Sequence, residues 1–65
     1  MPFTVHDKLV CAMRELALRR SAYPRFVANK RMSQANADRE IALMEAIAHD
    51  YGTLADREAE TLKGR

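Results

Sequence analysis

The sequence is short of several residue types, and each shortage excludes a class of structure. Cys11 is the only cysteine, so no disulfide forms within one chain. No stretch approaches the roughly 20 apolar residues that a membrane-spanning helix needs. β-Branched residues are few, and no run alternates between apolar and polar residues for long enough to indicate a strand. One thiol and the lack of a signal-peptide pattern are typical of a cytoplasmic protein.

The chain is also short. Its 65 residues form one domain at most, which we expect to span residues 1–65. A chain of this size buries only about 60% of the surface that its unfolded form exposes, so its own core is marginal. A metal or a second chain commonly supplies the missing stability, and self-association is the more frequent of the two. We therefore expect a homodimer.

The net charge of +2 hides an asymmetry between the two halves. Residues 1–32 carry seven Lys or Arg against two acidic residues, whereas residues 33–65 carry four against seven. Two interpretations are open. The halves fold against each other and attract, or the basic half faces a polyanion.

What the sequence does contain is a helix-forming composition, rich in Ala, Leu, Met, Glu and Arg. Thr4 is placed as an N-cap, with Asp7 in the first turn. The first helix is expected over about 4–22, with either a kink or a restart at Pro24 that continues to residue 29. Its apolar positions recur in steps of three and four: Val5, Leu9, Ala12, Met13, Leu16, Tyr23 and Val27.

Ser33 is placed as the N-cap of a second helix, expected over about 34–51. Two continuations are open at Gly52, because glycine weakens a helix interior and Thr53 with Asp56 resembles a capping box. Either a short third helix begins there, or the second helix runs on to about residue 62. The apolar stripe of this helix comprises Ala37, Ile41, Met44, Ala48, Tyr51 and Ala55, flanked by Ile47 and Leu54.

The connection over residues 29–32 is short, so the helices should be antiparallel neighbours, with residue i near residue 61 − i. Two helices share only one mutual face, and we expect two such hairpins to pair into an all-α four-helix bundle. The residues expected in the core or dimer contact are Leu9, Met13, Leu16, Ile41, Met44, Ile47, Ala48 and Tyr51.

The corner between the helices is the candidate binding site. It holds Tyr23, Arg25, Phe26, Lys30 and Arg31, and aromatic and arginine side chains are the types that dominate protein interfaces. The corner contacts another protein, or its aromatic residues only close the end of the hairpin core. Weak nucleic-acid binding by the basic residues between 19 and 31 is the alternative function, although the acidic second helix would repel phosphates.

Other chemistry has little support. Cys11 and His49, with His6 or Asp50, lack the usual spacing of a zinc site. Two packed helices offer no catalytic cleft, and the first helix lacks bulky membrane anchors. We expect no enzymatic activity, no cofactor or metal, and no membrane binding.

A resemblance to known proteins rests on several runs of the chain, which include Lys8-Leu9-Val10-Cys11-Ala12, Tyr23-Pro24-Arg25-Phe26-Val27, Met32-Ser33-Gln34, Ala37-Asp38-Arg39-Glu40-Ile41 and Met44-Glu45-Ala46-Ile47. The chain is similar to a group of small proteins without assigned biochemistry, found in bacterial genomes, often in prophages, and in tailed phages of Proteobacteria. The similarity implies a phage-associated setting and a helical hairpin, and it implies no particular activity. The group usually has glycine where this chain has Lys30, so Asn29 is expected to adopt the left-handed conformation.

Overall fold

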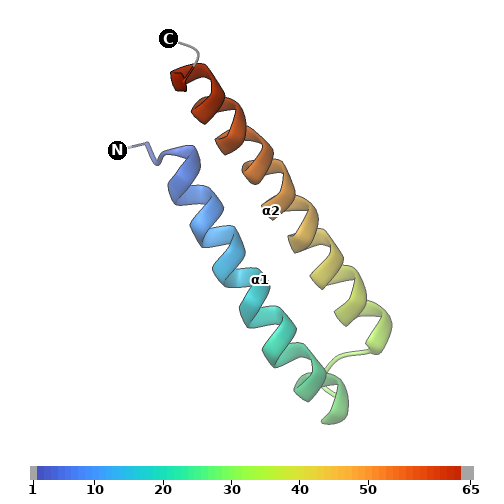
Figure 1. Ribbon diagram of the computed structural model, residues 1–65. Helices are drawn as coiled ribbons and strands as arrows, with labels where there is room; N and C mark the ends of the chain where they lie inside the picture. The colour runs from blue at the N-terminus through green and yellow to red at the C-terminus, as the bar shows by residue number, and fades with distance from the viewer. Residues whose placement is uncertain (1, 64–65) are drawn as a thin grey trace.

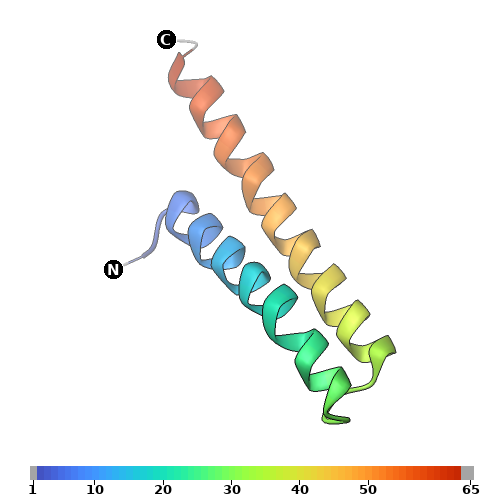
Figure 2. The same cartoon turned by 60° about the horizontal axis from the view of Figure 1, so that its bottom comes forward.

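A computed structural model describes the backbone of residues 2–63 and the side chains of residues 2–61. It contains two helices, α1 (Val5–Ala28) and α2 (Gln34–Lys63), and no strand within residues 2–63. The helices lie side by side and run in opposite directions, and the last turns of α2 reach past the start of α1 (Figures 1 and 2). The all-α prediction is therefore confirmed for this part of the chain.

Side-chain caps fix where each helix begins. The Thr4 hydroxyl accepts a hydrogen bond from the Asp7 backbone N–H at 3.0 Å, and the Asp7 carboxylate accepts one from the Thr4 N–H at 3.2 Å. This reciprocal pair is a capping box. The Ser33 hydroxyl accepts from the Asn36 N–H at 3.1 Å and starts α2 in the same way. Both caps satisfy backbone donors that a helix cannot satisfy internally.

The end of α1 is closed by backbone hydrogen bonds. The Arg31 N–H donates to the Phe26 carbonyl at 2.8 Å, and the Lys30 N–H donates to the Val27 carbonyl at 3.0 Å. These two bonds form a Schellman motif, whose central residue is left-handed. That residue is Lys30, with φ 60°, and not Asn29, whose φ is −89°. The expectation for Asn29 is wrong because the bond pattern sets the left-handed position one residue later.

Pro24 lies inside α1 and does not interrupt it. The expected restart is therefore absent, since residues on both sides of Pro24 belong to one helix. Pro24 is exposed, so its ring faces away from α2 and water can reach the Arg20 carbonyl that loses its partner. Tyr23, Phe26 and Val27 are half-buried, and their packing keeps the last turns of α1 helical.

Gly52 also lies within a helix. Residues 53–62 belong to α2 and form no separate third helix. The Thr53 hydroxyl donates to the His49 carbonyl at 3.1 Å, a bond made inside a continuing helix, so Thr53 caps nothing. A Cβ built on Gly52 would lie 4.0 Å from Leu9 Cδ1. Leu9 and Gly52 thus face each other, as the expected pairing of i with 61 − i requires.

The contact between the helices is narrow. Its buried residues are Ala12, Ala22, Ala37 and Met44. The other residues expected in the core are distributed as follows: Leu9, Leu16, Ile41, Ala48 and Tyr51 are half-buried, whereas Ile47 is 37% and Met13 is 57% exposed. Met13 lies outside the contact between α1 and α2 because it is one residue, or about 100°, around the helix from the buried Ala12.

Opposite charges meet across the helix pair. Arg20 Nη2 lies 2.6 Å from Glu45 Oε2, and Arg19 Nη1 lies 3.9 Å from Glu40 Oε1. Arg19 also donates to the Glu40 backbone carbonyl at 2.8 Å. Part of the charge asymmetry between the two halves therefore serves their mutual attraction. The Arg20–Glu45 pair is about half exposed and contributes below about 1 kcal/mol.

Candidate interaction surfaces

The aromatic pair of the corner belongs to the seam between the helices. The rings of Tyr23 and Phe26 are half-buried, with centroids 5.9 Å apart and planes inclined by 34°. The Arg19 guanidinium lies 5.9 Å from the centre of the Tyr23 ring, within the range of a cation–π contact. Arg19 is itself fixed by Glu15, at 3.0 Å from Nε to Oε1. These contacts link successive turns of the second half of α1 to one another.

The basic residues of the corner form a second, outer set. Arg25, Lys30 and Arg31 are all exposed, and none of them makes an ion pair with another residue between 2 and 63. Arg25 lies in the last turn of α1, where a cation is favoured by the helix dipole. The five residues predicted for the corner thus separate into a half-buried aromatic pair and an exposed cationic set, here called the basic corner (Arg25, Lys30 and Arg31).

A shallow groove runs along one face of the hairpin. Its volume is about 640 Å³. The Lys8 ammonium lies 6.0 Å from the centre of the Tyr51 ring and so borders this groove. Both helices contribute, with Phe3 from the segment before α1; the lining residues are Phe3, Asp7, Lys8, Cys11, Ala12, Glu15, Met44, Ile47 and Tyr51.

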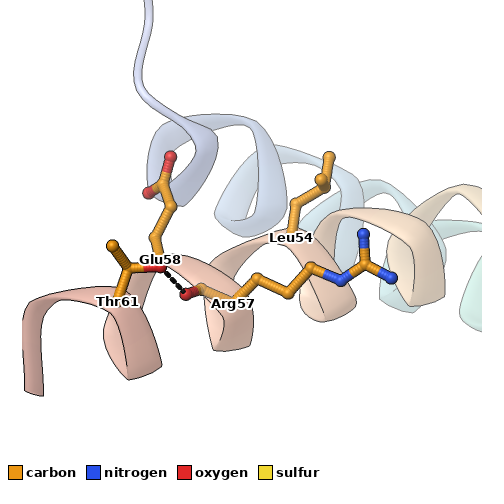
Figure 3. Close-up of a pocket in the computed structure, with 4 residues that line it drawn as sticks. All are labelled: Leu54, Arg57, Glu58 and Thr61. Carbon is orange, nitrogen blue, oxygen red and sulfur yellow. Dashed lines mark hydrogen bonds between the residues drawn. The ribbon is translucent and has the colours of Figure 1, made fainter. Parts of the chain in front are cut away.

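The apolar lining continues along α2. Leu54 lies seven residues after Ile47, on the same side of the helix. With Arg57, Glu58 and Thr61 it borders a second hollow of about 360 Å³. Figure 3 shows the Leu54 and Glu58 side chains pointing to the same side of α2, and the Thr61 hydroxyl donating to the Arg57 carbonyl at 2.9 Å. This hollow lies on the last turns of α2 and shares no lining residue with the first groove.

Together these residues define one surface, here called the apolar face: Phe3, Cys11, Leu18, Leu43, Ile47 and Leu54. Leu18 follows Cys11 by seven residues and Leu43 precedes Ile47 by four, so both lie on the groove side of their helices. Leu18 is 59% and Leu43 is 46% exposed. Sequence analysis missed Phe3, Leu18 and Leu43 because it followed only the stripe between the helices. The sequence does show this second stripe, because Cys11 and Leu18 are seven residues apart, and Leu43, Ile47 and Leu54 are four and seven residues apart.

No group of three or more His, Cys, Asp or Glu side chains gathers to hold a metal ion within the described residues. The His49 side chain is 81% exposed, and Cys11 is exposed on the apolar face. Neither helix, as far as it is described, has a segment long and apolar enough to cross a bilayer.

No protein family, curated protein or solved structure matches this chain significantly. The resemblance to phage-associated proteins therefore stays a prediction. The surfaces that can indicate a function are the basic corner and the apolar face.

Proposed function

We propose that this chain is a small protein–protein interaction module, phage- or prophage-associated as the resemblance implies, that acts as a homodimer of paired hairpins. The main support is the amount of apolar surface that two helices leave open. Among the residues whose side chains are described, three of the four buried ones are alanines, whereas the large apolar side chains of the apolar face, from Phe3 to Leu54, are 37–74% exposed. Contiguous apolar surface of this kind marks a contact with protein.

The basic corner is the proposed contact for a second, different protein. Its backbone is fixed by the Schellman bonds at 2.8 and 3.0 Å, so its cations are presented from a rigid frame. The aromatic pair beneath it stiffens the last turns of α1. Arginine is enriched at the energetic centres of interfaces, and preorganised side chains lose little entropy on binding. A partner surface bearing carboxylates would complement this corner.

Replacing Arg25 with Ala should separate binding from folding. Arg25 is exposed and makes no ion pair with the residues between 2 and 63, so we expect unchanged helicity by circular dichroism. The affinity for a partner captured from phage-infected cells should fall about tenfold, which corresponds to roughly 1.4 kcal/mol. Calorimetry with the purified partner measures this.

Arg14→Ala is the matched control, since Arg14 is an exposed arginine of α1 far from the corner. It should leave the affinity within about twofold of the original value. Equal losses in both variants would show that only overall charge matters. A loss of helicity in Arg25→Ala would make that residue structural.

Nucleic-acid binding is the second candidate, favoured by the three exposed cations of the basic corner. The two functions differ in their response to salt. Binding to phosphates through these three cations should fall about 40-fold between 50 and 200 mM salt. Binding to protein through apolar contacts with a few charges should fall much less. The exposed acidic residues Asp38, Glu45 and Asp50 of α2 confine any phosphate contact to the corner.

A further inference from the structure

The hairpin exposes more surface than a compact chain of its mass. Its accessible surface is 5358 Å², whereas a folded monomer of this mass is expected to expose about 4,200 Å². The excess is roughly 1,100 Å². The shape accounts for it, because the Cα atoms span 53 × 22 × 15 Å, the thickness of a single layer of helices. A stable fold normally packs two layers.

A second copy of the chain can supply the second layer, and the surface that it would cover has the expected area. A protein interface of standard size buries about 800 Å² from each partner, which is similar to the excess of this chain. The apolar face is the natural place for it, because both helices contribute to it. Two hairpins stacked on this face make four helices around one core, a common helical architecture.

The opposite face of the hairpin is less suited to that contact. It carries the ion pair between Arg20 and Glu45, which a stacked partner would remove from water. Met13, 57% exposed, lies on that side, five residues and therefore about 140° around α1 from Leu18. On the apolar face, the charged residues that line the groove are Asp7, Lys8 and Glu15, and all three come from α1. They can stay at the rim of an interface.

The charge distribution favours one relative orientation of the two stacked hairpins. Residues 25–31 contain three basic residues and no acidic one, whereas residues 56–65 contain three of each. Stacking with both corners at the same end would bring two basic corners together. Stacking with the corners at opposite ends removes this repulsion, because the corners are then separated by several Debye lengths of about 8 Å.

We infer that the apolar face binds a second copy of this chain in an antiparallel stack, with the two basic corners at opposite ends of a four-helix bundle. The inference rests on the proposed function, for which it names the first partner and the arrangement. The dimer then presents two separate corners. A partner with two matching sites would gain from engaging both at once.

Leu18→Glu and Met13→Glu form a matched pair for the test. The side chains are 59% and 57% exposed, both lie on α1, and each variant adds the same charge. Sedimentation equilibrium of the unmodified chain should show a dimer at micromolar concentration. Leu18→Glu should raise the dimer dissociation constant at least about tenfold, because it places a charge inside the interface. Met13→Glu should change it less than about threefold.

If the chain folds only as a dimer, a variant that cannot pair also unfolds, and circular dichroism then reports the loss of pairing as a loss of helicity. Loss of helicity at low concentration in Leu18→Glu but not in Met13→Glu then supports the inference equally well. Equal effects of the two substitutions, or a larger effect of Met13→Glu, would overturn the choice of face. A single 7.4 kDa species at all concentrations up to millimolar would overturn the dimer itself.

Spin labels report the orientation. A Cys11→Ala, Ala28→Cys variant carries one label on the exposed last residue of α1. Corners at opposite ends predict a separation of roughly 35–50 Å, from the length of a 24-residue helix and its turn. A separation below about 20 Å, about two helix widths, would overturn the antiparallel stack. Binding of a different protein at the corner is read separately from the Arg25→Ala affinity, so either claim can fail while the other stands.

Discussion

At the scale of single residues, Lys30 has a strained backbone conformation and also adds a positive charge to the basic corner. Its φ of 60° is the left-handed conformation, which costs a residue with a Cβ about 1 kcal/mol or more. The Schellman bonds hold it there, and its exposed ammonium extends the basic corner. The residue thus supplies a cation where backbone preference alone would favour glycine.

Lys30→Gly should therefore stabilise the fold. We expect the free energy of unfolding to rise by about 1 kcal/mol in urea titrations, since glycine adopts φ 60° without strain. Lys30→Ala is the control, because it removes the charge and keeps the strain, and it should change stability little. If alanine stabilises as much as glycine does, the left-handed backbone is not the cause. In the proposed function, both variants should bind the partner more weakly.

Single residues also show where sequence reasoning succeeds. Thr4 and Ser33 were predicted as caps, and their hydroxyls accept the expected hydrogen bonds at 3.0 and 3.1 Å. Local chemistry decides a cap, so a short stretch of sequence suffices to predict it. Lys30 shows the reverse, because its conformation depends on which residue of the corner completes the bond pattern.

At the scale of the helices, α2 has one intrinsic weak position. Gly52 lies in its interior, where glycine costs about 1 kcal/mol relative to alanine. The space for a methyl group is open, because its nearest neighbour outside the helix backbone would be Leu9 Cδ1 at 4.0 Å. Gly52 faces α1, away from the apolar face, so a substitution there tests α2 without altering the inferred dimer contact.

Gly52→Ala should raise the free energy of unfolding by about 1 kcal/mol, and the melting temperature by about 4–8 °C. Ala46→Gly is the reciprocal control at an exposed position of α2 and should lower stability by a similar amount. Thermal unfolding followed by circular dichroism measures both. A destabilised Gly52→Ala would mean that the added methyl group cannot be accommodated against Leu9.

The helices also show why their boundaries were harder to predict than their existence. Pro24 and Gly52 are local signals for a break, yet both lie inside helices. Neighbouring half-buried residues such as Phe26 and Ala55 pack between α1 and α2, and this packing outweighs one lost hydrogen bond or one glycine. The apolar face was missed for a related reason, since periodicity does not tell which of two adjacent stripes turns inward.

At the scale of the whole molecule, stability rests on very little buried surface. A 15 Å layer of Cα atoms has room for one seam of side chains, and within residues 2–61 Met44 is the only large side chain buried in it. Such a chain has little free energy of unfolding to spare. In the inferred dimer, Met44 and the groove that it lines lie between the two layers. Folding and pairing of the hairpins then depend on the same few residues.

Met44→Asp should therefore unfold the chain. Met44 is 8% exposed, so an aspartate there would bury a charge. The penalty of several kcal/mol is comparable with the whole stability of a 65-residue domain. Ala46→Asp, two residues along α2 and exposed, adds the same charge and should stay helical. Far-UV circular dichroism at a fixed micromolar concentration compares them, and a helical Met44→Asp chain would show that the seam between α1 and α2 is not what holds the hairpin together.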